Sequence, residues 1–287
     1  MSSTKPTGEA IREIVQGQGS LLEAAIGCKI NGYTPLECAK ELYENRSTPT
    51  AAELAGAIVS AWGCIVSSAT LTAALQSCQA WDAPTIAAAT SAALHLTWLD
   101  DAEIGGSLLH TIGLFKGDLT TMASAESVPV LVISTLPGDY QNVPGSMIAA
   151  LAAHGVSVAS LAQHMALDRR SQNGCWLSQT ITGQSFSQLL VLETTGDKAI
   201  AAIPGVMTTL QAALPTPTSE ENLTIACSML STGSAGANPS QVLTALFGAA
   251  KAAMSSGYAL AGCKIVNYQQ GWDTQLTGTF HQLKAGV

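Results

Sequence analysis

The chain has 287 residues, and only 11% of them are Asp, Glu, Lys or Arg, whereas an average soluble domain has about a quarter. Twenty acidic and twelve basic residues give a net charge of −8, without the clustered basic stripe that is typical of nucleic-acid-binding domains. The high hydrophobic content, 47%, excludes a disordered chain. So little charge predicts an apolar surface that must be shielded from water, and we expect it to be buried against copies of the same chain.

Residues 1–53 are ordinarily charged and are predicted to form an N-terminal helical arm or small lobe. Thr34-Pro35-Leu36-Glu37 has the pattern of a helix start, with an N-cap residue, a proline at the first helical position and a glutamate at the third. The first residues lack a basic start followed by an apolar stretch, so we expect no secretory signal and a location in the cytoplasm or in a virion.

Residues 54–126 are predicted to form an apolar helical core. No charged residue occurs between Glu53 and Asp82, which predicts helices that are buried on all sides. This stretch is long enough to cross a bilayer, but its many Ser, Thr, Gly and Gln residues favour burial in protein, and we expect no membrane contact. Asp100-Asp101-Ala102-Glu103 predicts the start of another helix, because carboxylates favour helix N-termini and no second acidic motif completes a metal site.

Residues 127–287 are predicted to form a C-terminal lobe, either helical or α/β. The β-branched run 127–135 ends in the turn sequence Leu136-Pro137-Gly138-Asp139 and is compatible with a buried strand. Similar runs, separated by Ala-rich segments, lie at 156–158, 189–195 and 222–229. Short apolar runs do not distinguish a strand from a buried helix. We therefore expect a mainly α fold, with an α-helical N-terminal half and an α/β C-terminal half as the alternative.

No catalytic or metal-binding motif stands out in the sequence. It contains no GxSxG, no HxxxH and no CxxC, and its seven cysteines are predicted to be reduced, mostly buried thiols. The small-residue segment 231–239 lacks a Walker sequence and a complete GxGxxG, so it is predicted to be a linker before a helix. These observations predict a protein that is not an enzyme and that has no metal or cofactor.

One segment resembles a cofactor-binding family. Residues 136–161 contain Pro137-Gly138-Asp139, an Ala-rich helical stretch and His154-Gly155, and they are similar to the first β-α-β unit of cobalamin-binding domains. Gln141 occupies the place of that family's cobalt-ligating histidine. The resemblance implies, as an alternative function, a cofactor-binding α/β protein of the cobalamin type.

A second resemblance points to a structural role. Gly32-Tyr33, Ala61-Trp62-Gly63-Cys64 and Leu136-Pro137-Gly138-Asp139-Tyr140 resemble elements that occur in the same order in nucleocapsid proteins of phenuivirus-like RNA viruses. The resemblance implies an all-helical subunit that exchanges an N-terminal arm and coats RNA. We therefore expect a self-assembling structural protein, a viral coat or nucleocapsid-like subunit that forms a capsid or filament around RNA. The candidates for phosphate contact are Arg169, Arg170, Lys116, Lys251 and Lys264.

Overall fold

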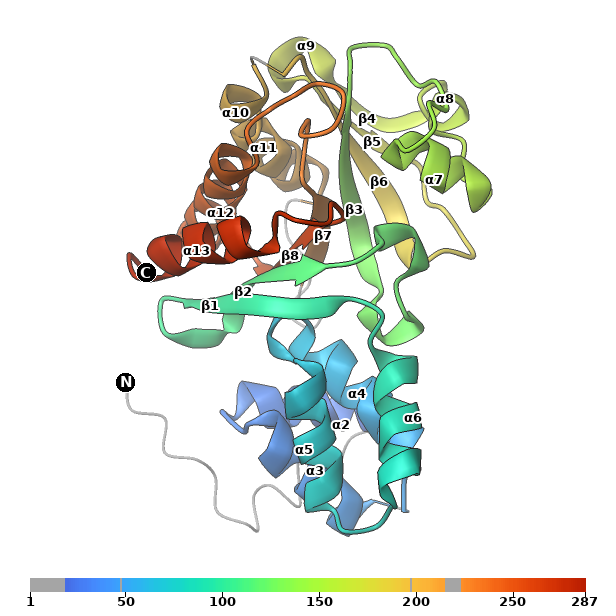
Figure 1. Cartoon of the computed structure of the whole chain (residues 1–287), viewed down its shortest axis with the longest axis vertical. Coiled ribbons are helices and arrows are strands. Elements are labelled where there is room, and N and C mark those ends of the chain that lie inside the picture. Colours follow the sequence, from blue (N-terminus) through green and yellow to red (C-terminus); the bar gives the residue numbers. More distant parts are fainter. Residues whose placement is uncertain (1–18, 47, 197, 215–222) are drawn as a thin grey trace.

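The computed structural model describes residues 19–46, 48–196, 198–214 and 223–287. A bundle of helices forms the N-terminal lobe, and a sheet covered by helices forms the rest of the described chain (Figure 1). Within the described ranges, no helix has the length and apolar character required to cross a bilayer. Residues 1–18 of the predicted N-terminal arm lie outside the described residues.

The helical lobe comprises α2 (Leu21–Ile30), α3 (Pro35–Asn45), α4 (Ala51–Trp62), α5 (Ser68–Ser77) and α6 (Ala83–Ala93). A Ser, Thr or Asp side chain caps the N-terminus of each of these helices, and α2, α3 and α4 have complete capping boxes with a glutamate three residues on. The helix start predicted at Thr34 is thus confirmed.

The uncharged stretch after Glu53 builds the core of this lobe. Leu54, Ile58 and Trp62 of α4 are buried against the neighbouring helices, and Leu71 and Leu75 of α5 join them. The predicted domain limit at residue 53 falls in the first turn of α4, and the limit at residue 126 falls at the end of the 3-10 turn η3 (Ser124–Glu126). The predicted division into domains stays a prediction.

The expectation of a mainly α fold is wrong, because the chain contains an eight-stranded mixed sheet in the order β1-β2-β8-β7-β3-β6-β5-β4. The central strands β2, β8, β7, β3 and β6 are mutually parallel, and antiparallel strands flank them at both ends. The strands are β1 (Thr97–Ile104), β2 (Ser107–Lys116), β3 (Val128–Thr135), β4 (Met165–Arg169), β5 (Cys175–Ser178), β6 (Phe186–Glu193), β7 (Leu223–Ser228) and β8 (Leu260–Asn267).

The sequence interpretation failed most clearly at β1. Asp100-Asp101-Ala102-Glu103 lies in this strand and does not start a helix. Asp100 is buried, and its carboxylate lies 3.1 Å from Lys284 Nζ and 3.4 Å from His281 Nε2, both on α13 (Asp273–Lys284). Lys284 and His281 are distant from Asp100 in sequence, so local helix-capping arguments do not apply to this acidic cluster.

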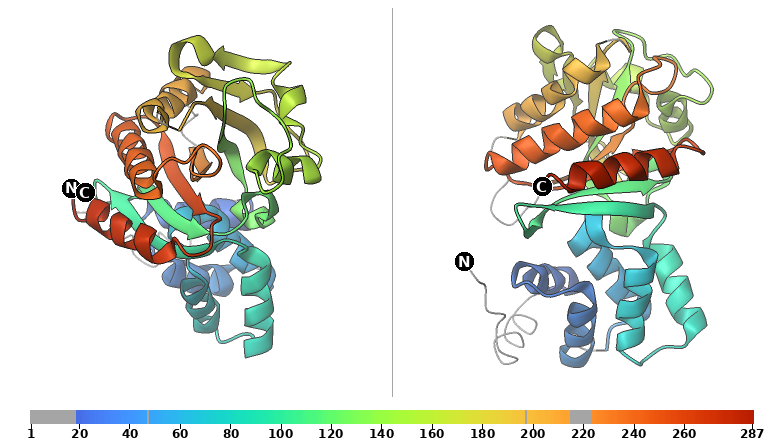
Figure 2. Two further views of the ribbon diagram at one scale, coloured as in Figure 1. Left: turned by 45° about the horizontal axis from the view of Figure 1, so that its top comes forward. Right: turned by 60° about the vertical axis from the view of Figure 1, so that its left-hand side comes forward.

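Helices cover the sheet on both faces. On one face lie α10 (Ala199–Ala202), α11 (Pro204–Ala213), α12 (Pro239–Ser255) and α13, and the last two run side by side (Figure 2). The other face carries α7 (Met147–Ala153) and α8 (Val158–Leu161) and, farther along β2 and β8, the helical lobe. The side chains of β8 point to both faces of the sheet. Cys263 and Ile265 pack against α12, whereas Val266 packs in the hydrophobic core on the other face.

The helical lobe docks on glycines of the sheet. Gly113 of β2 lies against Cys64 in the 3-10 turn η1 (Gly63–Ile65). A Cβ at Gly113 would be only 2.6 Å from the backbone carbonyl oxygen of Cys64. Lys264 of β8 is buried in the same interface, and its Nζ donates to the backbone oxygen of Glu126 at 2.9 Å. Because Gly113 has no side chain, the helical lobe and the sheet approach each other closely at this point.

Candidate functional site

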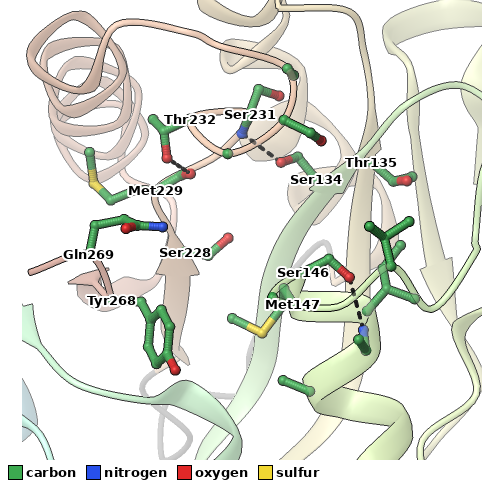
Figure 3. A pocket seen from close by; sticks show the side chains of 18 of the residues that line it. Ser134, Thr135, Ser146, Met147, Ser228, Met229, Ser231, Thr232, Tyr268 and Gln269 are labelled. Carbon is green, nitrogen blue, oxygen red and sulfur yellow. Dashed lines mark hydrogen bonds between the residues drawn. The ribbon is translucent and has the colours of Figure 1, made fainter.

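The chain leaves two neighbouring parallel strands in opposite directions. β3 continues into α7 on one face, towards β6, whereas β7 continues into α12 on the other face, towards β8. Such a divergence opens a crevice at the carboxyl ends of the strands, and ligands of α/β proteins commonly bind there. A cavity of about 580 Å³ lies at this edge, between the β3–α7 and β7–α12 loops (Figure 3).

The loop from β7 to α12 forms one wall of the cavity. The backbone N–H of Ser231 donates to Ser134 Oγ at the end of β3, 2.7 Å away, and Ser231 itself is left-handed, with φ 59°. Ala237 N–H donates back to Ser231 O at 2.9 Å, and Gly236 N–H donates to Gly233 O at 3.0 Å. Within the described chain, the amides of Gly233, Ser234 and Ala235 have no acceptor. Composition alone predicts this segment only as a linker.

The loop from β3 to α7 forms the facing wall. Ser146 caps α7, and its Oγ accepts the N–H of Ala149 at 3.1 Å. Inside the loop, Ser146 N–H donates to Val143 O at 3.0 Å. The next amides along this wall, those of Gly145, Met147 and Ile148, have no acceptor among the residues that the structure describes. Two loops therefore line one cavity with backbone N–H groups that are free to meet an acceptor.

The described lining carries little charge. Its only formal charges are the carboxylates of Asp118 and Asp139, and it has no lysine or arginine. Successive free backbone N–H groups in turns nevertheless form anion-binding concavities without a cation. The serine and threonine hydroxyls of the same walls add further donors. The arrangement is suited to an anion that is bound by hydrogen bonds rather than by ion pairs.

The other end of the cavity lies where β2 and β8 end. Asp118 follows β2, and its Oδ1 accepts from Thr120 N at 2.9 Å and from Thr120 Oγ1 at 2.7 Å. Its second oxygen has no partner among the described residues. Tyr268, just after β8, is 64% exposed at the rim. A fixed carboxylate and an exposed aromatic ring are suited to a flat ligand group with an N–H donor.

A partly buried polar network supports this end. Asn267, the last residue of β8, is fully buried and donates through Nδ2 to Asp273 Oδ1 at 2.9 Å. Asp273 Oδ2 in turn lies 2.6 Å from Lys116 Nζ at the end of β2. The hydrogen bond from Lys116 lowers the pKa of Asp273, so this carboxylate is charged at neutral pH. The network ties β2, β8 and the start of α13 together beneath the cavity.

The predicted phosphate-contacting residues lie on separate elements. Arg169 ends the edge strand β4, and Arg170 starts α9 (Arg170–Asn173) and forms a two-pronged ion pair with Asp168, with distances of 3.0 and 2.6 Å. Lys116 is paired with Asp273. Lys251 on α12 donates to Gly286 O at 2.7 Å. Lys264 is buried, and burial lowers its pKa. None of the five lines the cavity, and their contact with nucleic acid stays a prediction.

No protein-family model matches the sequence, and no curated protein resembles it. Among solved structures, the macrodomain of Oceanobacillus iheyensis with ADP is similar over 67% of this chain and 100% of that chain, with a TM-score of 0.51 and 12% identity. The chain has a macrodomain-like fold. The same macrodomain with MES bound gives the same values. A Trypanosoma brucei macrodomain in complex with ADP matches 60% of this chain and 70% of that chain, with a TM-score of 0.43 and 17% identity.

The macrodomain-like fold corrects both resemblances drawn from sequence. The central sheet excludes an all-helical nucleocapsid subunit. The predicted function as a viral coat or nucleocapsid-like structural protein is therefore wrong. The cobalamin-type alternative is wrong as well, because the similar solved structures are macrodomains. Nothing in the fold supports a virion location. Self-assembly and RNA as a partner stay predictions.

Sequence analysis missed this candidate site because the residues that form it are scattered along the chain. Asp118 follows β2, Ser134 lies in β3, Ser146 precedes α7 and Ser231 follows β7, and none lies in a recognisable motif. One local pattern was visible, the small-residue segment 231–239 between a strand-like run and a helix. Without the parallel neighbour β3, this pattern could not be distinguished from a linker.

Proposed function

We propose that the cavity binds a nucleoside diphosphate, either as ADP or as the ADP part of ADP-ribose. The observation that carries this proposal is the pair of facing loops at the divergence of β3 and β7, which line one cavity with free amides from residues 145, 147 and 148 and from residues 233–235. A diphosphate offers acceptor oxygens on both sides, so each loop has its own set of partners.

The dimensions and polarity of the cavity agree with such a ligand. Its volume of about 580 Å³ lies within the usual range of small-molecule sites. Apolar side chains of Met147, Met229 and Val266 line the space between the polar ends. This combination accommodates a ligand with a charged middle and a less polar nucleoside.

The nucleoside is assigned to the end of the cavity at β2 and β8. There the ring of Tyr268 is free to stack on a base, and the unpartnered oxygen of Asp118 is free to accept an exocyclic amine. Adenine has such an amine, whereas hypoxanthine does not. The similar structure from Oceanobacillus iheyensis is a macrodomain with ADP, which supports the same choice of ligand.

The proposal concerns binding. Both described carboxylates of the cavity accept hydrogen bonds from nearby backbone, Asp118 from Thr120 and Asp139 from Gln141. Among the described residues that line the cavity, no serine or threonine hydroxyl donates to a carboxylate. Catalysis is measured separately, by incubating the protein with an ADP-ribosylated protein and following release of ADP-ribose. Release would contradict the sequence-based expectation that the chain is not an enzyme.

The binding test is calorimetric titration with ADP, ADP-ribose, AMP and pyrophosphate. A Cβ at Gly233 would meet no atom within 4 Å, so Gly233→Leu adds bulk at an open position of the cavity wall, and we expect it to weaken ADP binding by about tenfold or more. Gly248→Leu, at an equally open and exposed position of α12, is the matched control and should bind like the wild type. Failure of the wild type to bind any of the four compounds would refute the proposed function.

A further inference from the structure

Three hydrogen-bond donors converge on the carboxylate of Glu193, the last residue of β6, which does not line the cavity itself. Trp176 Nε1 donates to its Oε1 at 3.0 Å, Tyr140 OH donates to the same oxygen, and Gly138 N–H donates to Oε2 at 3.0 Å. Gly138 and Tyr140 belong to the β3–α7 loop. The carboxylate therefore ties the first half of a cavity wall to the neighbouring strand.

Both oxygens of the Glu193 carboxyl group act as hydrogen-bond acceptors in this arrangement. The side chain of Glu193 is 8% exposed, and Arg170 Nη1 lies 3.8 Å from its Oε1. An amide in its place would turn an NH₂ group towards at least one of the three donors, so at least one of the three hydrogen bonds would be lost. The ring of Tyr140 is also fixed, because it packs edge-to-face on Trp176 with the ring centres 6.0 Å apart.

We infer that Glu193 is a positioning residue of the cavity: it holds the β3–α7 loop in the shape that presents the amides of residues 145, 147 and 148 to the diphosphate. The inference rests on the proposed function. The anchor acts close to the loop's origin, where Thr135 Oγ1 also donates to Asp139 O. Releasing Gly138 and Tyr140 frees the loop on the side of the cavity that is opposite residues 233–235.

The test is Glu193→Gln in the full chain, titrated with pyrophosphate, ADP and adenosine. Pyrophosphate and ADP should bind about tenfold more weakly. Adenosine affinity should be unchanged, because the nucleoside end of the cavity is built from the ends of β2 and β8. Glu103→Gln, at an exposed position of β1, removes the same charge far from this loop and is the matched control. General destabilisation would not separate the diphosphate from the nucleoside.

A second variant keeps the inference testable if Glu193→Gln does not fold. Tyr140→Phe removes one hydrogen bond that anchors the loop and retains the aromatic ring and Glu193. The affinity for pyrophosphate and ADP should therefore fall, by less than in Glu193→Gln, and the affinity for adenosine should not change. Unchanged pyrophosphate affinity in the folded variants, or an equal loss for adenosine, would overturn the positioning role. A wild-type protein that binds none of the probes would instead refute the proposed function, so the two failures are distinguishable.

Discussion

Gly196 and Ala235 are in backbone contact: a Cβ placed on Gly196 would lie 1.7 Å from the carbonyl oxygen of Ala235. Gly196 follows β6, and Ala235 lies in the β7–α12 loop, so one glycine after a strand sets how closely a cavity wall approaches the sheet. A side chain at this position would force the loop to move. The contact gives the first of four predictions.

Gly196→Ala should shift the loop that carries the amides of residues 233–235. We expect a lower melting temperature and ADP binding weakened by about tenfold, since overpacking against a backbone carbonyl costs on the order of 1–3 kcal/mol. Gly248→Ala, at an open helical position, is the control and should be neutral or slightly stabilising. Melting curves and calorimetry measure both effects, and an unchanged affinity in Gly196→Ala would contradict the contact's role.

Ser134→Ala should loosen the same loop from below. It removes the oxygen that accepts the N–H of Ser231 at 2.7 Å, and it leaves the N–H of this buried residue without an acceptor. The expected cost is about 1–3 kcal/mol in free energy of unfolding. Denaturant titration checks the stability, and Ser134→Thr, which keeps the hydroxyl, should lose less. Equal losses in the two variants would show that the hydroxyl is not the cause.

Asp118→Asn should change the choice of base. The asparagine oxygen can still accept from Thr120, but its NH₂ group replaces the free carboxylate oxygen that is proposed to meet an exocyclic amine. ADP binding should weaken by about tenfold, while binding of IDP, which lacks that amine, should change less. Asp82→Asn, at the exposed N-cap of α6 in the helical lobe, is the control, because asparagine caps a helix as well as aspartate does. Parallel losses for ADP and IDP would place the base elsewhere.

Lys264→Met should flatten the rise of stability with pH. Burial lowers the pKa of Lys264 in the folded protein, so the unfolded chain binds more protons and stability increases with pH until the unfolded lysine, with a pKa of about 10.4, also loses its proton. The slope from one such group is at most about 1.4 kcal/mol per pH unit.

Denaturant titrations of the wild type and Lys264→Met between pH 7 and 10 test this prediction. Buried thiols work in the opposite sense: burial raises the pKa of Cys64 to about 11, so stability falls as the unfolded thiol ionises. Removing Lys264 also removes a positive charge that lowers the pKa of Cys64. Because that pKa is about 11 in the wild type and would rise further in the variant, the folded thiol stays mainly protonated up to pH 10 in both, and the difference between the two proteins reports the lysine. Parallel curves would mean that Lys264 does not titrate differently on folding.

Local sequence rules predicted the elements that depend on neighbouring residues. The helix start at Thr34-Pro35 is confirmed because its capping bonds join residues three apart. The β-branched run that ends at Thr135 forms β3, since these side chains favour a strand buried on both faces. The acidic run 100–103 misled the same rules, because Lys284 and His281, which contact Asp100, lie on α13, far along the chain.

The sequence by itself determined the helix start at Thr34 and several strand-forming runs, since both depend on contacts within a few residues. The order of the strands and the cavity at the divergence of β3 and β7 were decided only by the tertiary structure. Glu193 shows the reason: its three donors come from positions 138, 140 and 176. Only the pairing of β6 with β3, which is parallel, and with β5, which is antiparallel, places them around one carboxylate, and no local pattern records that pairing.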